Sequence, residues 1–306
     1  MNHKTNLGIR AILYSARKWK KTLLVFFLLP FLIVLRISLA EMDGAMVSDL
    51  FTYANNELFM KLKLQNYLTI LADDLYLSTY AQSLKYAGIT TAVCLAIGYP
   101  FAYFMARSEP RWQPALLMGV MLPFWTSFLI RVYAWKGLLE ANGWIGAPIH
   151  ASGLDQVLAA LGLIPSPEQL LYSPFSLVLG MVYTYLPFMV LPLYATLSRM
   201  DLRLLEAALD LGATPWQAFW RITVPLSKPG IVAGSMLVFI PCVGEYVIPE
   251  LLGGPETLMI GRVLWDEFFA NNDWPMASAV AVVMILLLLV PLALFGRNQA
   301  QAREGA

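Results

Sequence analysis

Three charged residues share a depth within the long apolar stretches of the sequence: Arg36, Arg131 and Glu245. A charge in the hydrocarbon of a membrane is costly, so such a residue is a functional candidate and is expected to have a partner. Two interpretations are open. Glu245 forms an internal ion pair with Arg36 or Arg131, or it lines the path of a cationic solute. One residue can do both at different stages of a cycle.

The stretch that contains Glu245 also contains Pro241, Gly244 and Pro249. Proline removes a helix hydrogen bond, so a broken helix here would turn backbone carbonyls toward a cavity. Carbonyls, a carboxylate and aromatic rings together suit an ammonium group. The alternative is that the prolines only kink the helix and that the aromatic residues lie at the lipid interface. The residues that we place along a solute path are Glu245, Tyr246, Trp125, Tyr133 and Glu250.

A polar segment over 199–229 predicts a short helix, a tight turn and a second helix. Asp201 is a suitable N-cap for a helix over 202–211. Gly212 stands where a helix ends in the left-handed conformation. The pattern therefore predicts that the first helix ends at a fixed point.

The second helix of this segment has its own start signals. Thr214 and Gln217 are spaced as a capping box, and Pro215 occupies the first helical position. Pro225 is predicted to end the helix. Both helices have an apolar face, which either binds a partner surface or folds back onto the membrane spans. The face of the second helix consists of Trp216, Phe219, Trp220 and Thr223.

The same segment resembles the EAA loop of bacterial ABC importer permeases. That motif is Glu-Ala-Ala, three residues, Gly, nine residues, Ile, one residue, Leu and Pro. The matching residues are Glu206, Ala207, Ala208, Gly212, Ile222 and Pro225, and Val224 replaces the leucine. The resemblance implies a type I importer permease fold. It also implies that this loop inserts into a groove on an ATP-hydrolysing subunit and transmits its motion.

A narrower resemblance covers most of the chain and is to the polyamine branch of these permeases. It rests on the stretches 28–42, 123–135 and 239–255, with Cys242 where a small residue is expected. The first of the two permeases in such systems is the closest likeness. The resemblance implies import of putrescine or spermidine. The partners that it implies are two ATP-binding subunits, a second permease and a periplasmic solute-binding protein.

The composition shows what must position these residues. Hydrophobic residues make up 58% of the 306 residues and charged residues 13%, against about 45–50% and about 25% in soluble domains. A soluble domain and a disordered chain are both excluded. Crossing about 30 Å of hydrocarbon takes roughly 20 apolar residues. Six stretches qualify, at about 22–39, 84–106, 115–137, 175–197, 230–252 and 277–296. We therefore expect an all-α integral membrane protein with six transmembrane helices in the lipid bilayer.

The distribution of Lys and Arg predicts the orientation. Fourteen of the 21 lie in segments on the side of the N-terminus and three on the other side. Basic residues mark the cytoplasmic side, so both termini are expected inside a bacterial inner membrane. The first stretch could be read as a signal peptide, but its apolar run is too long, which favours an uncleaved helix. The resulting domains are a basic tail (1–21), a first helix (22–39), a periplasmic segment (40–83), a core with five helices (84–296) and a second tail (297–306).

The chain lacks the motifs of common catalytic sites. There is no Gly-Lys pair for a phosphate-binding loop, and the only histidines are His3 and His150. We expect no catalytic residue, no metal, no cofactor and no nucleic-acid partner, and ATP hydrolysis on a partner subunit. Two alternatives stay open. One is an importer of another small solute, such as an amino acid or ferric ion, and the other is a stand-alone proton-coupled carrier.

Overall fold

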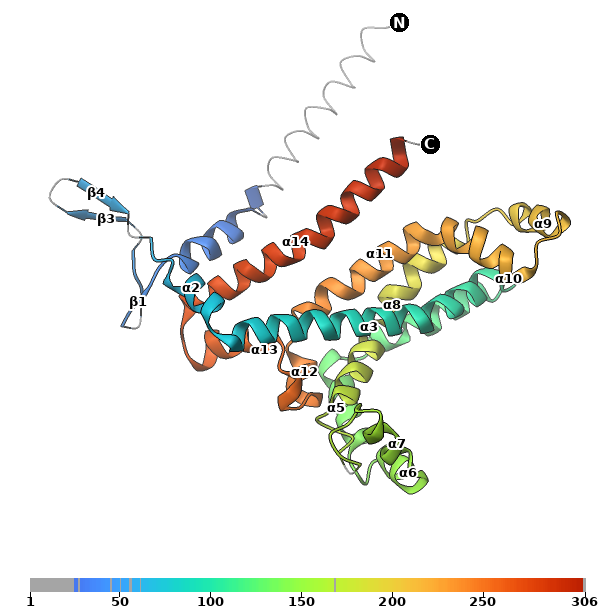
Figure 1. The fold of residues 1–306 in the computed structure, drawn as a ribbon, viewed down its shortest axis with the longest axis horizontal. Coiled ribbons are helices and arrows are strands. Elements are labelled where there is room, and N and C mark those ends of the chain that lie inside the picture. Colours follow the sequence, from blue (N-terminus) through green and yellow to red (C-terminus); the bar gives the residue numbers. More distant parts are fainter. Residues whose placement is uncertain are drawn as a thin grey trace, which may run out of the picture. The chain divides into compact units, whose positions relative to one another are not determined.

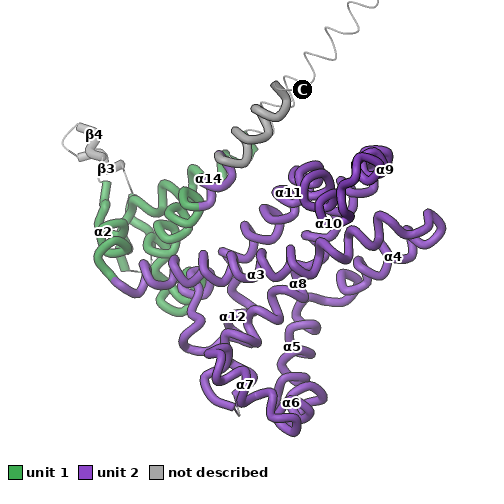
Figure 2. Tube along the Cα trace, turned by 45° about the vertical axis from the view of Figure 1, so that its right-hand side comes forward, with its two compact units in different colours: residues 1–73, 264–287 green, residues 74–263, 288–306 purple. Residues whose placement is uncertain are grey.

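The computed structural model describes residues 25–26, 28–44, 46–49, 51–54, 57–60, 62–167 and 169–304. The chain forms two compact units (Figure 2). The first contains the residues up to Asp73 together with Leu264–Leu287, and the second contains Asp74–Val263 and the residues from Leu288 onward. The predicted basic tail over 1–21 lies outside the described residues.

Three long helices form the centre of the second unit: α3 (Asp74–Arg107), α8 (Pro174–Leu197) and α11 (Val224–Val243). They run side by side (Figure 1), and each packs on the other two. Gly98 of α3 and Gly234 of α11 both face Met189 of α8, where an added Cβ would lie 3.1 Å and 2.8 Å from the methionine side chain. Small residues at these two positions let the three helices approach closely.

The third apolar stretch is bent. It consists of α4 (Gln113–Met121), the short helix η1 (Leu122–Trp125) and α5 (Phe128–Leu139), with a bend of 88°. The prediction of one helix over 115–137 is therefore wrong. Pro123 has no N–H to donate, and Thr126 adopts an extended conformation that ends η1. The helices α6 (Gly146–Ser152) and α7 (Leu154–Ala160) follow.

The fifth stretch begins earlier than expected. A continuous helix runs over Pro215–Val243, through α10 (Pro215–Ala218), the π-helical turn η2 (Phe219–Thr223) and α11. The prediction that Pro225 ends the helix is wrong. The Val224 N–H bonds to the Phe219 carbonyl, five residues back. This wider turn carries the chain past Pro225, whose missing donor would otherwise break the helix.

The fifth stretch also ends earlier than expected. After α11 the chain is interrupted at Gly244–Tyr246, and α12 (Val247–Leu252) follows. Of the two interpretations of Pro241, Gly244 and Pro249, the structure therefore shows the broken helix rather than a kink alone. In a continuous helix the ring of Pro249 would clash with the carbonyl of Glu245, four residues earlier. The chain then forms η3 (Pro255–Thr257), α13 (Ile260–Trp265), η4 (Asp266–Ala270) and α14 (Trp274–Glu304).

The described part of the first unit includes a helix over Leu28–Ser38. Two antiparallel hairpins follow, β1 (Met42–Asp43) with β2 (Met46–Val47) and β3 (Phe51–Ala54) with β4 (Glu57–Met60), and then α2 (Gln65–Ala72). Among the described residues, four helices are long and apolar enough to cross a membrane, and five if the bent pair counts as one. The number six stays a prediction, because the first expected span is described only in part.

Candidate functional site

The segment that resembles an EAA loop folds as a helix, a turn and a second helix (Figure 1). The first helix is α9 (Arg203–Asp210). Gly212 has φ +86°, and the next N–H, of Ala213, bonds to the carbonyl of Ala208 at 3.0 Å. The predicted left-handed end of the first helix is confirmed. Glycine fits here because a side chain is strained at this φ.

The start of each helix is fixed by its own side chains. The Asp201 carboxylate accepts the Arg203 N–H at 3.0 Å and also binds the Arg203 guanidinium. This bond to Arg203 lowers the pKa of the Asp201 carboxyl. The helix begins one residue later than predicted. The predicted capping box is confirmed, with both Thr214–Gln217 hydrogen bonds formed at 3.3 Å and 3.1 Å.

One part of the apolar faces of these helices packs on the membrane spans, and another part is exposed and free to bind a partner. Phe219 packs edge-on against Tyr99 and Tyr103 of α3, and Thr223 is buried. That part folds back onto the bundle. The exposed part includes Leu211, at 89% exposure, and Trp216, at 69%. The exposed large apolar residues between positions 202 and 220, which we call the coupling surface, are Leu202, Leu204, Leu209, Leu211, Trp216 and Trp220.

The residues of the EAA pattern lie around this surface. Glu206 and Ala207 are exposed on α9, and Ala208 is half-buried. Ile222 is half-buried in the π-helical turn, and Pro225 is exposed just beyond it. An exposed apolar surface beside an exposed carboxylate can bind another protein.

Glu245 lies in the interruption between α11 and α12. The hydroxyl of Tyr185, on α8, donates a hydrogen bond to its Oε2, and the Val247 N–H donates to its Oε1 at 3.1 Å. A half-buried carboxylate with two donors is satisfied without a cation. Tyr185 was not predicted from the sequence, because nothing local distinguishes it from the other tyrosines in apolar stretches.

The arginines take other partners than the predicted one. Arg36 forms an ion pair with Asp49 at 3.1 Å, within the first unit. Arg131 places its guanidinium over the rings of Phe124 and Phe128, 5.6 Å and 6.0 Å from the centroids. Within the part of the chain that the structure describes, its Nε and Nη1 atoms are buried without a hydrogen-bond partner. Among the described residues, Arg131 and Glu245 form no ion pair, and the Glu245 oxygens accept from Tyr185 and Val247 instead.

The other residues of the predicted path occupy three places. Tyr246 is half-buried beside Glu245, while Trp125 and Tyr133 are exposed on η1 and α5. Glu250 forms an ion pair with Arg262 of α13, with Nε and Oε2 2.6 Å apart. The sequence therefore predicted candidate path residues at the bend and at the interruption. It did not predict the ion pair of Glu250 with Arg262.

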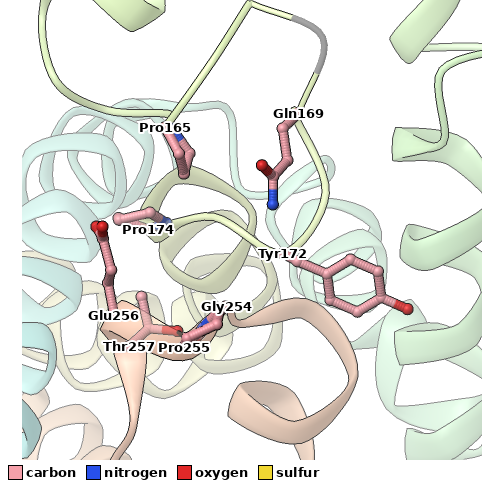
Figure 3. A pocket seen from close by; sticks show the side chains of 8 residues that line it. All are labelled: Pro165, Gln169, Tyr172, Pro174, Gly254, Pro255, Glu256 and Thr257. Carbon is pink, nitrogen blue, oxygen red and sulfur yellow. Dashed lines mark hydrogen bonds between the residues drawn. The ribbon is translucent and has the colours of Figure 1, made fainter.

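A cavity of about 230 Å³ lies near the end of α12 (Figure 3). Gly254 comes so close to the carbonyl of Tyr172 that a Cβ there would clash with it. This contact fixes the turn after α12 against the loop before α8. None of the predicted path residues lines the cavity. Its lining residues are Pro165, Gln169, Tyr172, Pro174, Gly254, Pro255, Glu256 and Thr257.

Comparison with known proteins gives consistent matches. Residues 98–298 match the family described as "Binding-protein-dependent transport system inner membrane component". A spermidine/putrescine transport system permease protein, PotB, of Haemophilus influenzae is 37% identical over 297 residues, which cover 97% of this chain and 95% of the relative. PotB of Escherichia coli is 38% identical over 276 residues, 90% of this chain and 93% of the relative.

Solved structures give the same fold at low sequence identity. A bacterial alginate ABC transporter, crystallised with an alginate-bound periplasmic protein, matches with a TM-score of 0.62. The match covers 99% of this chain and 98% of the other at 15% identity. The fold is therefore that of a chain of an ABC transporter.

Proposed function

Because the chain belongs to the family of binding-protein-dependent transport system inner membrane components, we propose that it is the permease subunit of an ATP-driven importer of polyamines, namely putrescine and spermidine. The observation that carries this proposal is the agreement, over nearly the whole length, with permeases named for these two solutes. The chain is a multi-pass protein of the inner membrane.

The broken fifth span supports a cationic solute. Glu245 is held by Tyr185 and by the Val247 N–H at a point where the backbone leaves the helix. A polyamine carries two or more ammonium groups, and each needs a counter-charge in a low-dielectric path. The carboxylate of Glu245 supplies one, with the ring of Tyr246 beside it. Trp125, Tyr133 and Glu250 extend the path toward its outer end.

The proposed mechanism is alternating access driven by ATP hydrolysis on two partner subunits. The coupling surface, with Glu206, Ala207, Ala208 and Gly212, inserts into a groove of one ATP-binding subunit. Ile222 lies in η2 and Pro225 in the first turn of α11, within one continuous helix. Movement of the loop is therefore carried directly into a span. A second permease completes the path, and a periplasmic binding protein delivers the solute.

Isolation of the complex tests the proposal. The chain is purified from native membranes, the co-purifying proteins are identified by mass spectrometry, and uptake of labelled putrescine and spermidine is measured in proteoliposomes. We expect two ATP-binding subunits, a second permease and ATP-dependent uptake of at least one polyamine. Uptake that persists without the ATPase would instead support a stand-alone carrier. Uptake of an amino acid or ferric ion, but of no polyamine, would assign another solute.

A further inference from the structure

The ion pair between Glu250 and Arg262 joins two short helices at the broken span. Glu250 lies on α12 and Arg262 on α13, with 2.6 Å between Oε2 and Nε. Their side chains are 47% and 33% exposed. An ion pair with this much contact with water contributes little to stability and is open to exchange with another cation.

The backbone of α13 holds Arg262 at the interruption that carries Glu245. Gly261, the preceding residue, faces the carbonyls of Gly244 and Glu245, and an added Cβ would lie 2.5 Å and 2.6 Å from these oxygens. The Ile260 N–H donates to Ser83 Oγ of α3 at 2.8 Å. The start of α13 is thus fixed on two sides, so the guanidinium stays within reach of Glu250.

We propose that Arg262 is a built-in counter-ion of Glu250, which an ammonium group of the solute displaces during transport. A guanidinium and an ammonium group compete for the same carboxylate oxygen. With Arg262 in place, the pair of carboxylate and guanidinium has no net charge. It therefore holds a second cation weakly, and a passing polyamine is not trapped there. This inference rests on the proposed transport of polyamines and adds a residue that sets how strongly the path attracts them.

Four complexes test the exchange: wild type, Glu250→Gln, Arg262→Gln and the double variant. Putrescine uptake per complex is measured in proteoliposomes with saturating binding protein and limiting solute. We expect Glu250→Gln to lower uptake about tenfold, because the carboxylate is lost. Arg262→Gln should raise it about threefold, because the carboxylate is then free. The double variant should match Glu250→Gln. Each complex is quantified, so a change in yield is kept apart from a change in rate.

Salt provides a second measurement. The gain in Arg262→Gln should shrink as ionic strength rises, since the Debye length falls from about 10 Å at 0.1 M to about 3 Å at 1 M. A purely structural ion pair would not give this dependence. Arg262→Lys keeps the charge and should behave like wild type. Arg262→Met is a second neutral variant, expected to match Arg262→Gln.

Arg111→Gln is the matched control. Arg111 pairs with Glu109 at the same separation, 2.6 Å, but in the connection between α3 and α4. It should leave uptake and its salt dependence unchanged. Equal losses in the two single variants, with recovery in the double or in the exchange Glu250→Arg/Arg262→Glu, would overturn the inference in favour of a structural pair. Normal uptake by Glu250→Gln would also overturn it. A wild-type complex that takes up no polyamine would overturn the proposed function itself.

Discussion

Glu245 shows how a carboxylate is kept half-buried without a cation. Its two oxygens accept from the Tyr185 hydroxyl and the Val247 N–H, and those donors come from a neighbouring helix and from the start of α12. Tyr185 is itself buried and its ring lies 6.2 Å from that of Phe188. The tyrosine therefore fixes the orientation of the carboxylate. The carboxylate oxygens can still accept a further hydrogen bond from an ammonium group.

Removing the charge of Glu245 should impair transport more than assembly. We expect Glu245→Gln to lower polyamine uptake at least about tenfold, because about 1.4 kcal/mol of lost solute attraction corresponds to that factor. Complex yield should stay near wild type, since no arginine loses its partner. Labelled putrescine and spermidine uptake, with complex yield, measures both effects. Normal uptake of both solutes would remove Glu245 from the path.

Removing only the hydroxyl of Tyr185 should have a smaller effect. Tyr185→Phe deletes one of the two donors that orient Glu245 and leaves the carboxylate itself in place. We expect uptake per complex to fall while the charge remains. Tyr183→Phe is the control, because Tyr183 lies two residues earlier on α8 and its ring packs on Trp135. Equal effects of the two substitutions would contradict a specific role for Tyr185.

The sequence predicted Glu245 but not its partners. A carboxylate between a glycine and two prolines is visible in the chain itself. Tyr185 lies 60 residues away, and its pairing depends on how α8 packs on α11. Arg36 and Arg131 were plausible partners by depth in the bilayer alone. The actual geometry of the third stretch, with its 88° bend, could not be read from apolar length.

At the scale of elements, three prolines of this chain have three different outcomes. Pro123 accompanies a bend, Pro225 a π-helical turn, and Pro249 an interruption. Each proline removes the same donor, so the difference comes from the neighbouring helices and from what the freed carbonyls can bind. The local end signals at Gly212 and Thr214 were predictable because they act within four residues, whereas the outcome at each proline was not.

The turn at Gly212 offers a test of whether the segment 199–229 couples the permease to its ATPase partner. An added Cβ at Gly212 would meet no atom within 4 Å, so the cost of a side chain comes from φ +86° alone. We expect Gly212→Val to cost about 1–2 kcal/mol and to displace α9. The variant should insert normally but lose the ATPase partner or solute-stimulated hydrolysis. Gly212→Asn tolerates this conformation better and is the control. Wild-type coupling in the valine variant would refute the role.

The α6–α7 pair contains a pH-sensitive contact. His150 Nδ1 and Asp155 Oδ2 are 2.9 Å apart, and this hydrogen bond lowers the pKa of the Asp155 carboxyl. A carboxyl with a lowered pKa stabilises the fold above its ordinary pKa of about 4, and this stabilisation is lost as pH falls through the lower folded value. Amide exchange in α7, corrected for intrinsic rates, should therefore rise in that acid range. Asp155→Asn should remove the dependence, and an unchanged profile would contradict it.

At the scale of the whole molecule, the described helices support four spans and a fifth if the bent pair crosses as one. The described residues of the first expected span form a helix over Leu28–Ser38, and about 20 residues are needed to cross the hydrocarbon. The sequence adds residues before Leu28 that are also apolar. Six spans require that the bent pair crosses as one and that the first stretch crosses as well. The side on which the first stretch begins then decides the orientation of every later segment.

Reporter fusions at four positions decide the topology. From the distribution of Lys and Arg, fusions after Lys21 and after Gly296 should report the inside, and fusions after Lys63 and after Asp155 the outside. If the first stretch crosses, the reporters after Lys21 and Lys63 lie on opposite sides. The same side for these two would remove the first span. The same side for the reporters after Asp155 and Gly296 would contradict the three crossings predicted between them. A reporter after Asp155 that reads inside, together with one after Gly296 that reads outside, would place the coupling surface away from the cytoplasm, where no ATPase could reach it.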